Sequence, residues 1–299
     1  MLHTMLDYAA LAVVSAVIRE GTFERAAAAL CISPSAVSQR VRALEERLGA
    51  SLIARTQPCQ PTDLGRRLCA HFDRVRLLEA ELAPTLPAGM ARRPVTLPIA
   101  ANADSLATWL PDAIAAFASA SGCFIELALD DEAHTAERLR SGEVMAVVSS
   151  DPAPVPGCKT SPLGTLRYIA CASPDFVARH FPQGPGPEAL ATAPHMRFDR
   201  RDGLQASWAQ RRGTGPLSGT THWVPSTHAF LDLGLRGLGW AMQPEALARP
   251  HIAAGRLVEL VPDAPLDVPL YWTVARLHAG PLRALSEAVG RAARAQLRR

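Results

Sequence analysis

Apolar residues recur every three or four positions in three successive segments near the start of the chain, a spacing that gives an α-helix one buried face. The first segment covers residues 6–19, and the second follows Gly21 in the alanine-rich stretch TFERAAAALC. A third begins at Ser33 and Pro34, because serine is a favoured N-cap and proline a favoured first helical residue. The pattern predicts three short helices, with a tight turn between the second and the third.

The third predicted helix has two faces of different chemistry. Its apolar side is formed by Ala36, Val37, Val41, Leu44 and Leu48. Polar side chains stand mainly away from that side, namely Ser35, Ser38, Gln39, Arg40 and Arg42. This is the layout of a helix-turn-helix, whose recognition helix enters the major groove of DNA, where hydroxyl, amide and guanidinium groups contact base edges and phosphates. The same pattern also suits a solvated helix face in an ordinary bundle.

A short hairpin and a long helix are predicted next. SLIAR is typical of a strand and TQPCQP of a proline-limited loop. Together they have the size of a winged hairpin, which would place Arg55, Thr56 and Gln57 beside a DNA groove. From residue 63 to about residue 86 apolar positions again recur at helical steps, at Leu64, Leu68, Phe72, Val75, Leu78 and Leu82. A seam of this length indicates a partner helix, so we expect a homodimer or homotetramer.

The remaining two hundred or so residues alternate short apolar strands with helical segments. The first strands and helices are predicted in VTLPIAANADSLA, FIELALD and TAERLRSGEVMAVVSS, a βαβ rhythm that indicates a mostly parallel sheet. The pattern continues in LRYIACAS, FLDLGLRG, GWAMQP and LVEL, and LDVPLYWTVARL leads to a last helix over residues 280–297. We therefore expect two α/β lobes, with lobe one at about residues 93–164 and 268–299 and lobe two at about 165–267. Ligands of such folds bind between the lobes, where strands end and helices begin.

Polar side chains gather at those predicted strand ends. The candidate ligand-binding residues are Asn102, Asp104, Ser105, Trp109, Asp130, Asp131, Glu132, Phe198, Asp199, Ser226, Thr227 and His228. Carboxylates suit a cationic group and backbone amides near Ser105 and Ser226 suit a carboxylate, so the set fits a free basic amino acid. The alternatives are that the three consecutive acids form a solvated strand end or a helix cap, and that Trp109 belongs to the core.

Composition and charge narrow the class of protein. With 299 residues, 48% of them hydrophobic and 20% charged, the chain has the composition of a globular protein of two or three domains. Its net charge of +3 permits an acidic partner without requiring one. We expect a cytoplasmic protein with no membrane partner, because the N-terminus lacks a leader pattern and no run of about 18 apolar residues occurs. Six cysteines without a CxxC pair or a histidine cluster indicate neither a disulfide framework nor a metal site.

The stretch FERAAAALCISPSAVSQRVRALEERLGASLIARTQPCQPTDLG resembles the DNA-binding block of the LysR-type transcriptional regulators. The segments NADSLATWLPDAI, DEAHTAERLRSGEV, FVARHFP and LYW extend the resemblance over nearly the whole chain, toward the subgroup of arginine and lysine export regulators called ArgP and LysG. The family's recognition helix usually opens with Ser-Gln-Pro-Ala, whereas this one has Ser33, Pro34, Ser35 and Ala36, and Gln39 stands where the family has arginine. The operator sequence therefore need not be shared.

The resemblance implies an architecture and a set of partners. The fold is expected to be α+β, with a winged helix-turn-helix (residues 1–62), a linker and dimerisation helix (63–88) and a two-lobed, periplasmic-binding-protein-like effector domain (93–299). Double-stranded DNA and RNA polymerase are the expected partners, and lysine or arginine is the expected effector, with no other cofactor. The implied DNA-contacting residues are Ser33, Pro34, Ser35, Ser38, Gln39, Arg40, Arg55 and Thr56.

Other functions stay open from the sequence. A regulator of the same family could take a different effector, and relatives are also described as inhibitors of chromosome replication initiation. A two-lobed α/β domain could also be an enzyme or a transport binding protein. The chain has no GxSxG, HExxH, P-loop or strand-linked GxGxxG motif, so we expect no catalytic residues, and a transport binding protein would require an export leader.

Overall fold

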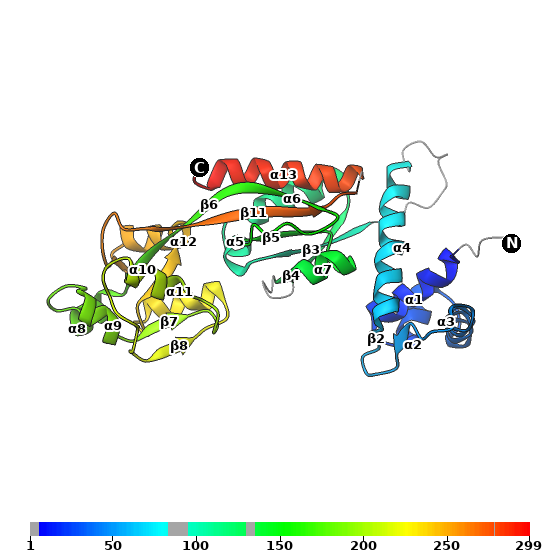
Figure 1. Ribbon diagram of the computed structural model, residues 1–299, viewed down its shortest axis with the longest axis horizontal. Coiled ribbons are helices and arrows are strands. Elements are labelled where there is room, and N and C mark those ends of the chain that lie inside the picture. Colours follow the sequence, from blue (N-terminus) through cyan, green and yellow to red (C-terminus); the bar gives the residue numbers. More distant parts are fainter. Residues whose placement is uncertain (1–5, 83–94, 130–134, 278) are drawn as a thin grey trace.

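The computed structural model describes residues 6–82, 95–129, 135–277 and 279–299. Figure 1 shows a helical head at one end, a central sheet beneath a long C-terminal helix, and a smaller mixed lobe at the other end. One upright helix stands between the head and the sheet (Figure 1). The predicted α+β architecture is confirmed.

Three helices form the head, as the sequence predicted: α1 (Tyr8–Glu20), α2 (Phe23–Leu30) and α3 (Pro34–Leu48). Each is preceded by a side chain that accepts a backbone N–H three residues ahead, from Asp7, Thr22 and Ser33. Cys31 adopts the left-handed conformation (φ 55°) and makes the tight turn between α2 and α3. The predicted apolar faces meet in one core, which includes Leu11, Val14, Val17, Val37, Val41 and Leu44.

A small wing follows α3. Strand β1 (Ile53–Ala54) pairs antiparallel with β2 (Gln60–Pro61), so the predicted hairpin is present but short. The Glu45 carboxylate on α3 accepts backbone N–H groups of Leu52 (2.7 Å) and Ile53 (3.3 Å). These bonds attach the wing to α3 and fix its position relative to that helix.

The long helix α4 (Asp63–Leu82) packs twice against its own chain. Near its start, Leu68 and Phe72 pack against the head, where the Phe72 ring stacks on Tyr8 with centroids 6.4 Å apart. Further along, Leu77 is fully buried in the core of the central sheet. The apolar face predicted as an intermolecular seam is therefore partly used within the chain, because periodicity shows which face is buried but not what covers it. Two seam positions stay exposed, Leu64 and Leu78. The predicted helix beyond residue 82 lies outside the described residues.

Among the described residues, seven strands form the main sheet, in the order β10, β6, β11, β5, β3, β4, with β9 also beside β6. The strands are β3 (Thr96–Ala101), β4 (Phe124–Leu129), β5 (Ala146–Ser149), β6 (Cys158–Ala172), β9 (Ala241–Pro244), β10 (Val258–Glu259) and β11 (Leu266–Ala275). β3 runs parallel to β4 and β5, as the βαβ rhythm predicted. The expectation of a mostly parallel sheet is wrong for the other pairs, which are antiparallel. The reason is that β6 carries the chain out of lobe one and β11 brings it back (Figure 1).

Helices surround both lobes. Lobe one carries α5 (Ala103–Ala107), α6 (Leu110–Ser121), α7 (Thr135–Ser141) and α13 (Gly280–Gln296). Lobe two carries α8 (Pro174–His180), α9 (Pro187–Thr192), α10 (Leu204–Gln210), α11 (Thr227–Leu235) and α12 (Glu245–Ala253), with the parallel pair β7 (His195–Arg197) and β8 (Thr221–Trp223). The largest cluster of buried side chains extends through both lobes and includes Trp109, Trp208, Trp240 and Trp272. Of the helices that the structure describes, none is long and apolar enough to cross a membrane.

Candidate DNA-binding surface and effector cavity

The start of α3 presents polar side chains to solvent. Gln39 and Arg40 are exposed and Ser38 is half-buried, whereas Val37 on the opposite face is fully buried. The Ser33 hydroxyl caps the helix by accepting the Ala36 N–H at 3.2 Å. Two more residues predicted to contact DNA, Pro34 and Ser35, are also exposed. This arrangement leaves hydroxyl, amide and guanidinium groups free to enter a groove.

The wing adds a second polar surface to the head. Arg55 and Thr56 are both exposed, and the Arg55 guanidinium lies over the Phe23 ring, 5.4 Å from its centroid. The Thr56 hydroxyl donates to the Pro58 carbonyl oxygen at 2.7 Å, which orders the tip of the loop. Among the described residues, neither Arg40 nor Arg55 forms an ion pair, so both guanidinium groups can bind phosphate.

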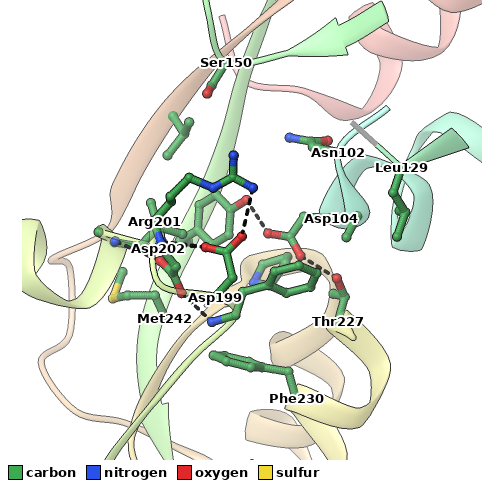
Figure 2. Close-up of a pocket in the computed structure, with 17 residues that line it drawn as sticks. Asn102, Asp104, Leu129, Ser150, Asp199, Arg201, Asp202, Thr227, Phe230 and Met242 are labelled. Atoms are coloured by element: carbon green, nitrogen blue, oxygen red, sulfur yellow. Dashed lines mark hydrogen bonds and ion pairs between the residues drawn. The ribbon is translucent and has the colours of Figure 1, made fainter. Parts of the chain in front are cut away.

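A cavity of about 270 Å³ lies between the two lobes (Figure 2). Lobe one contributes the start of α5 and the ends of β4 and β5, and lobe two contributes the loop before α10 and the start of α11. Its polar lining residues are Asn102, Asp104, Ser150, Tyr168, Asp199, Arg201, Asp202 and Thr227. Apolar side chains complete it, among them Leu129, Phe198, Leu204, Phe230, Met242 and Val268. The cavity therefore lies where the sequence placed a ligand, at strand ends and helix starts.

Asp104 joins three elements within this cavity. Its carboxylate accepts the Tyr168 hydroxyl of β6 at 2.6 Å and the Thr227 hydroxyl of α11 at 2.7 Å. Burial raises the pKa of Asp104 and is the largest influence on it. The two hydrogen bonds lower this pKa and the negative charge of Asp202 raises it, both to a smaller extent. Because Asp104 belongs to lobe one and Thr227 to lobe two, this carboxylate links the lobes directly (Figure 2).

The loop before α10 holds two further carboxylates in fixed positions. Asp199 accepts the backbone N–H groups of Arg201 (2.7 Å) and Asp202 (3.0 Å), and its second oxygen lies 3.6 Å from the Arg201 guanidinium. Asp202 accepts the backbone N–H groups of Phe198 (2.8 Å) and Leu204 (3.0 Å). The described lining thus carries three carboxylates and one guanidinium, an excess of negative charge that favours a ligand with a cationic group.

Five of the residues predicted to bind a ligand line this cavity, namely Asn102, Asp104, Phe198, Asp199 and Thr227. Asp130, Asp131 and Glu132 lie outside the described residues. Tyr168, Arg201 and Asp202 also line the cavity but were not among the candidates. Two of the missed residues had a signal in the sequence, since Arg201 and Asp202 stand two and three positions after the candidate Asp199. Tyr168 had none, because it lies in the middle of a long strand.

Four other predicted residues are not at the cavity. Ser105 and Trp109 are 0% and 1% exposed and belong to the core, where the Trp109 indole donates to the Ser105 hydroxyl at 3.1 Å. Ser105 lies on α5 and Trp109 directly before α6, whereas Asp104, the neighbour of Ser105, lines the cavity. Ser226 caps α11 by accepting the Ala229 N–H, and His228 is exposed. Thr227, between those two residues, is the one that points inward.

Metal chemistry has no site in the described part of the chain. No group of three or more histidine, cysteine, aspartate or glutamate side chains there could hold a metal ion. The six cysteines are free thiols. Burial raises the pKa of Cys69 and of Cys171 to about 12, so these two thiols stay protonated and unreactive.

Two family models match the chain, one over its N-terminal part and one over most of the rest. Residues 8–66 match the profile of the bacterial regulatory helix-turn-helix protein, lysR family, and residues 91–298 match the LysR substrate binding domain. The transcriptional regulator ArgP of Pseudomonas fluorescens is 42% identical over 272 residues, 90% of each chain. The regulator LysG of Mycobacterium tuberculosis is 37% identical over 293 residues, 98% of this chain and 95% of its own.

Two solved structures share the whole architecture. The crystal structure of ArgP from Mycobacterium tuberculosis superposes with a TM-score of 0.80 at 37% identity and covers 99% of both chains. Full-length LysG from Corynebacterium glutamicum with the bound effector Arg has a TM-score of 0.70 at 38% identity, covering 98% of this chain and 100% of the other. The named relatives are transcriptional regulators and not enzymes, which sets aside a catalytic role for the two lobes. The chain belongs to the LysR family of transcriptional regulators.

Proposed function

We propose that this regulator senses lysine or arginine in the cavity between its lobes and passes that signal to DNA bound by its head. The excess of carboxylates around the cavity carries the proposal, because a cationic side chain would neutralise it. The arginine-bound LysG, 38% identical to this chain, supports the same effector class.

The cavity offers partners for both ends of a basic amino acid. Arg201 and the Asn102 amide can donate to the α-carboxylate, and guanidinium pairs with carboxylate in two parallel hydrogen bonds. Asp104 and Asp199 can accept from the ammonium or guanidinium groups of the ligand. We include Asp130, Asp131 and Glu132 in the proposed site on the sequence alone, because they follow β4, whose last residue, Leu129, lines the cavity.

On the DNA side, we propose that α3 reads the major groove through Ser35, Ser38, Gln39 and Arg40, with Arg55 and Thr56 of the wing on the backbone. Ser33 and Pro34 set the start of that helix. The division proposed from sequence is retained: residues 1–62 bind DNA, 63–88 link and dimerise, and 93–299 bind the effector. The exposed Leu64 and Leu78 on α4 suit a partner helix in a homodimer or homotetramer. We also propose that the protein acts in the cytoplasm together with RNA polymerase.

Signal transfer would start from the link between the lobes. A ligand that hydrogen-bonds to the Asp104 carboxylate competes for it with the hydroxyls of Tyr168 and Thr227. Ligand binding therefore changes the relative stability of different arrangements of the two lobes. Leu77 of α4 is buried in the effector-domain core. A rearrangement of that core would therefore move α4, the helix that leads to the head.

Calorimetric titration of the full chain tests the effector site. Arginine and lysine should bind, while citrulline, the uncharged isostere of arginine, should bind at least about tenfold more weakly, a difference of about 1.4 kcal/mol or more. Asp199→Asn should weaken arginine binding to a similar extent. The matched control is Asp151→Asn, since Asp151 also accepts a backbone N–H (2.8 Å) but lies outside the cavity. Equal affinity for citrulline and arginine would refute the proposed charge recognition.

A further inference from the structure

A second cavity, of about 540 Å³, lies in lobe one between α13 and the strands β6 and β11. It shares no lining residue with the cavity between the lobes. One wall is formed by residues 159–163 of β6, another by residues 272–275 of β11, and the third by α13 from residue 282 to residue 294. Its volume is in the range of small-molecule sites.

The charged side chains of this second cavity are all cationic. Lys159, the only lysine of the chain, stands on β6, and Arg283 and Arg294 stand on α13. No aspartate or glutamate lines the cavity, and none of the three cations makes an ion pair with a residue that the structure describes. By contrast, Arg298, just after the same helix, is neutralised by Glu245 at 3.1 Å. Three uncompensated positive charges around one hollow favour an anion within it.

The floor of the second cavity is apolar and ordered. The Trp272 indole is 4% exposed, and its N–H donates to the Ser286 hydroxyl at 3.0 Å, which in turn donates to the Leu282 carbonyl oxygen at 2.8 Å. The apolar lining also includes Leu163, Val274, Leu277 and Ala279. Gly290 has no side chain on the α13 wall, which leaves the hollow open there. A ligand therefore needs an apolar body as well as a negative charge.

We propose that this cavity is a second ligand site, which binds an organic carboxylate with an apolar body. The arginines on α13 supply the planar donor pairs that match a carboxylate, and Lys159 adds a third positive charge from the opposite wall. Trp272 and the aliphatic side chains around it take the apolar body out of water. Because α13 also packs against α4, a ligand here would act on the helix that joins the head to the effector domain.

Binding of two carboxylates and one uncharged amide to the full chain tests this site. In calorimetric titrations, octanoate or 2-naphthoate should bind, and the uncharged octanamide should bind at least tenfold more weakly than octanoate. The double variant Arg283→Gln, Arg294→Gln should weaken carboxylate binding at least tenfold. The matched control is Arg291→Gln, because Arg291 is an exposed arginine of the same helix that does not line the cavity.

A second variant tests whether the ligand occupies the hollow itself. Gly290→Leu would fill the hollow and should abolish octanoate binding, while thermal unfolding shows whether each variant folds. Failure of both carboxylates to bind the wild type would overturn the proposal, as would equal affinity for octanoate and octanamide. Binding that survives both Gly290→Leu and the double arginine variant would also overturn it. Arginine is titrated into the same variants, because unchanged arginine affinity shows that a variant affects the second cavity and not the cavity between the lobes.

Discussion

Removal of one hydroxyl group, by Tyr168→Phe, tests the link between the lobes. The Tyr168 side chain is 4% exposed and its hydroxyl donates to Asp104 at 2.6 Å. The substitution keeps the ring and its packing, so the lost hydrogen bond dominates the effect. The Asp104 carboxylate then retains the bond from Thr227.

The size of the loss follows from the charge of the acceptor. A hydrogen bond to an ionised group contributes about 1.5–3 kcal/mol to stability, and a neutral pair about 0.5–1.5 kcal/mol. With Asp104 ionised, Tyr168→Phe should therefore lower the free energy of unfolding by about 1.5–3 kcal/mol. At about 2–4 °C per kcal/mol for a domain of this size, the melting temperature should fall by roughly 3–12 °C.

Intrinsic tryptophan fluorescence during thermal unfolding is the suitable assay. All five tryptophans belong to the effector domain, at positions 109, 208, 223, 240 and 272, so the signal reports that domain alone. Tyr271→Phe is the matched control, because Tyr271 is half-buried on β11 and its hydroxyl makes no hydrogen bond to a described residue. Equal melting temperatures for the two variants would refute the proposed link.

Three further predictions concern charge, backbone space and DNA contact. Burial raises the pKa of Asp104, so the folded chain holds this proton more tightly than the unfolded chain, and the contribution of Asp104 to stability falls as pH rises from the usual carboxyl pKa to the raised value. Asp104→Asn should therefore gain stability relative to the wild type across that interval, as measured by denaturant unfolding at several pH values; a constant difference would contradict the assigned direction. Gly65→Ala should destabilise the head by about 1–3 kcal/mol, because the added methyl would lie 2.0 Å from the Leu52 carbonyl oxygen. Gly290→Ala, which meets only the flexible end of a side chain at 3.3 Å, should be neutral or stabilising, and circular dichroism during thermal unfolding measures both variants because it also reports the head. Arg40→Ala should weaken operator binding by about 1–3 kcal/mol in fluorescence anisotropy, and unchanged affinity on every duplex would remove Arg40 from the interface.

The head could be predicted from sequence almost completely. Its helices begin at local signals, such as Thr22 and Ser33, and its apolar periodicity has one buried face per helix. Periodicity left open what covers a buried face where more than one partner was possible. Phe72 fits an intermolecular seam and also the head of its own chain, and only the fold shows that it stacks on Tyr8.

The cavity was predicted where its residues follow strand ends. Asn102, Asp104, Phe198 and Asp199 have that position in the chain. Tyr168 reaches the cavity from the middle of β6, because that strand crosses from one lobe to the other, and crossing strands leave no local signal. The antiparallel pairing of β6 and β11 has the same origin, since strand direction depends on the path of the chain between lobes.

We propose that an amino acid bound between the lobes controls how the head binds DNA. The most direct test is a footprint of the full chain on a duplex selected from random sequence, measured with and without arginine. We expect protection of a defined site, with a length or affinity that arginine changes in the wild type and in Asp151→Asn but not in Asp199→Asn. The same footprint and affinity with and without arginine or lysine in the wild type would contradict the account.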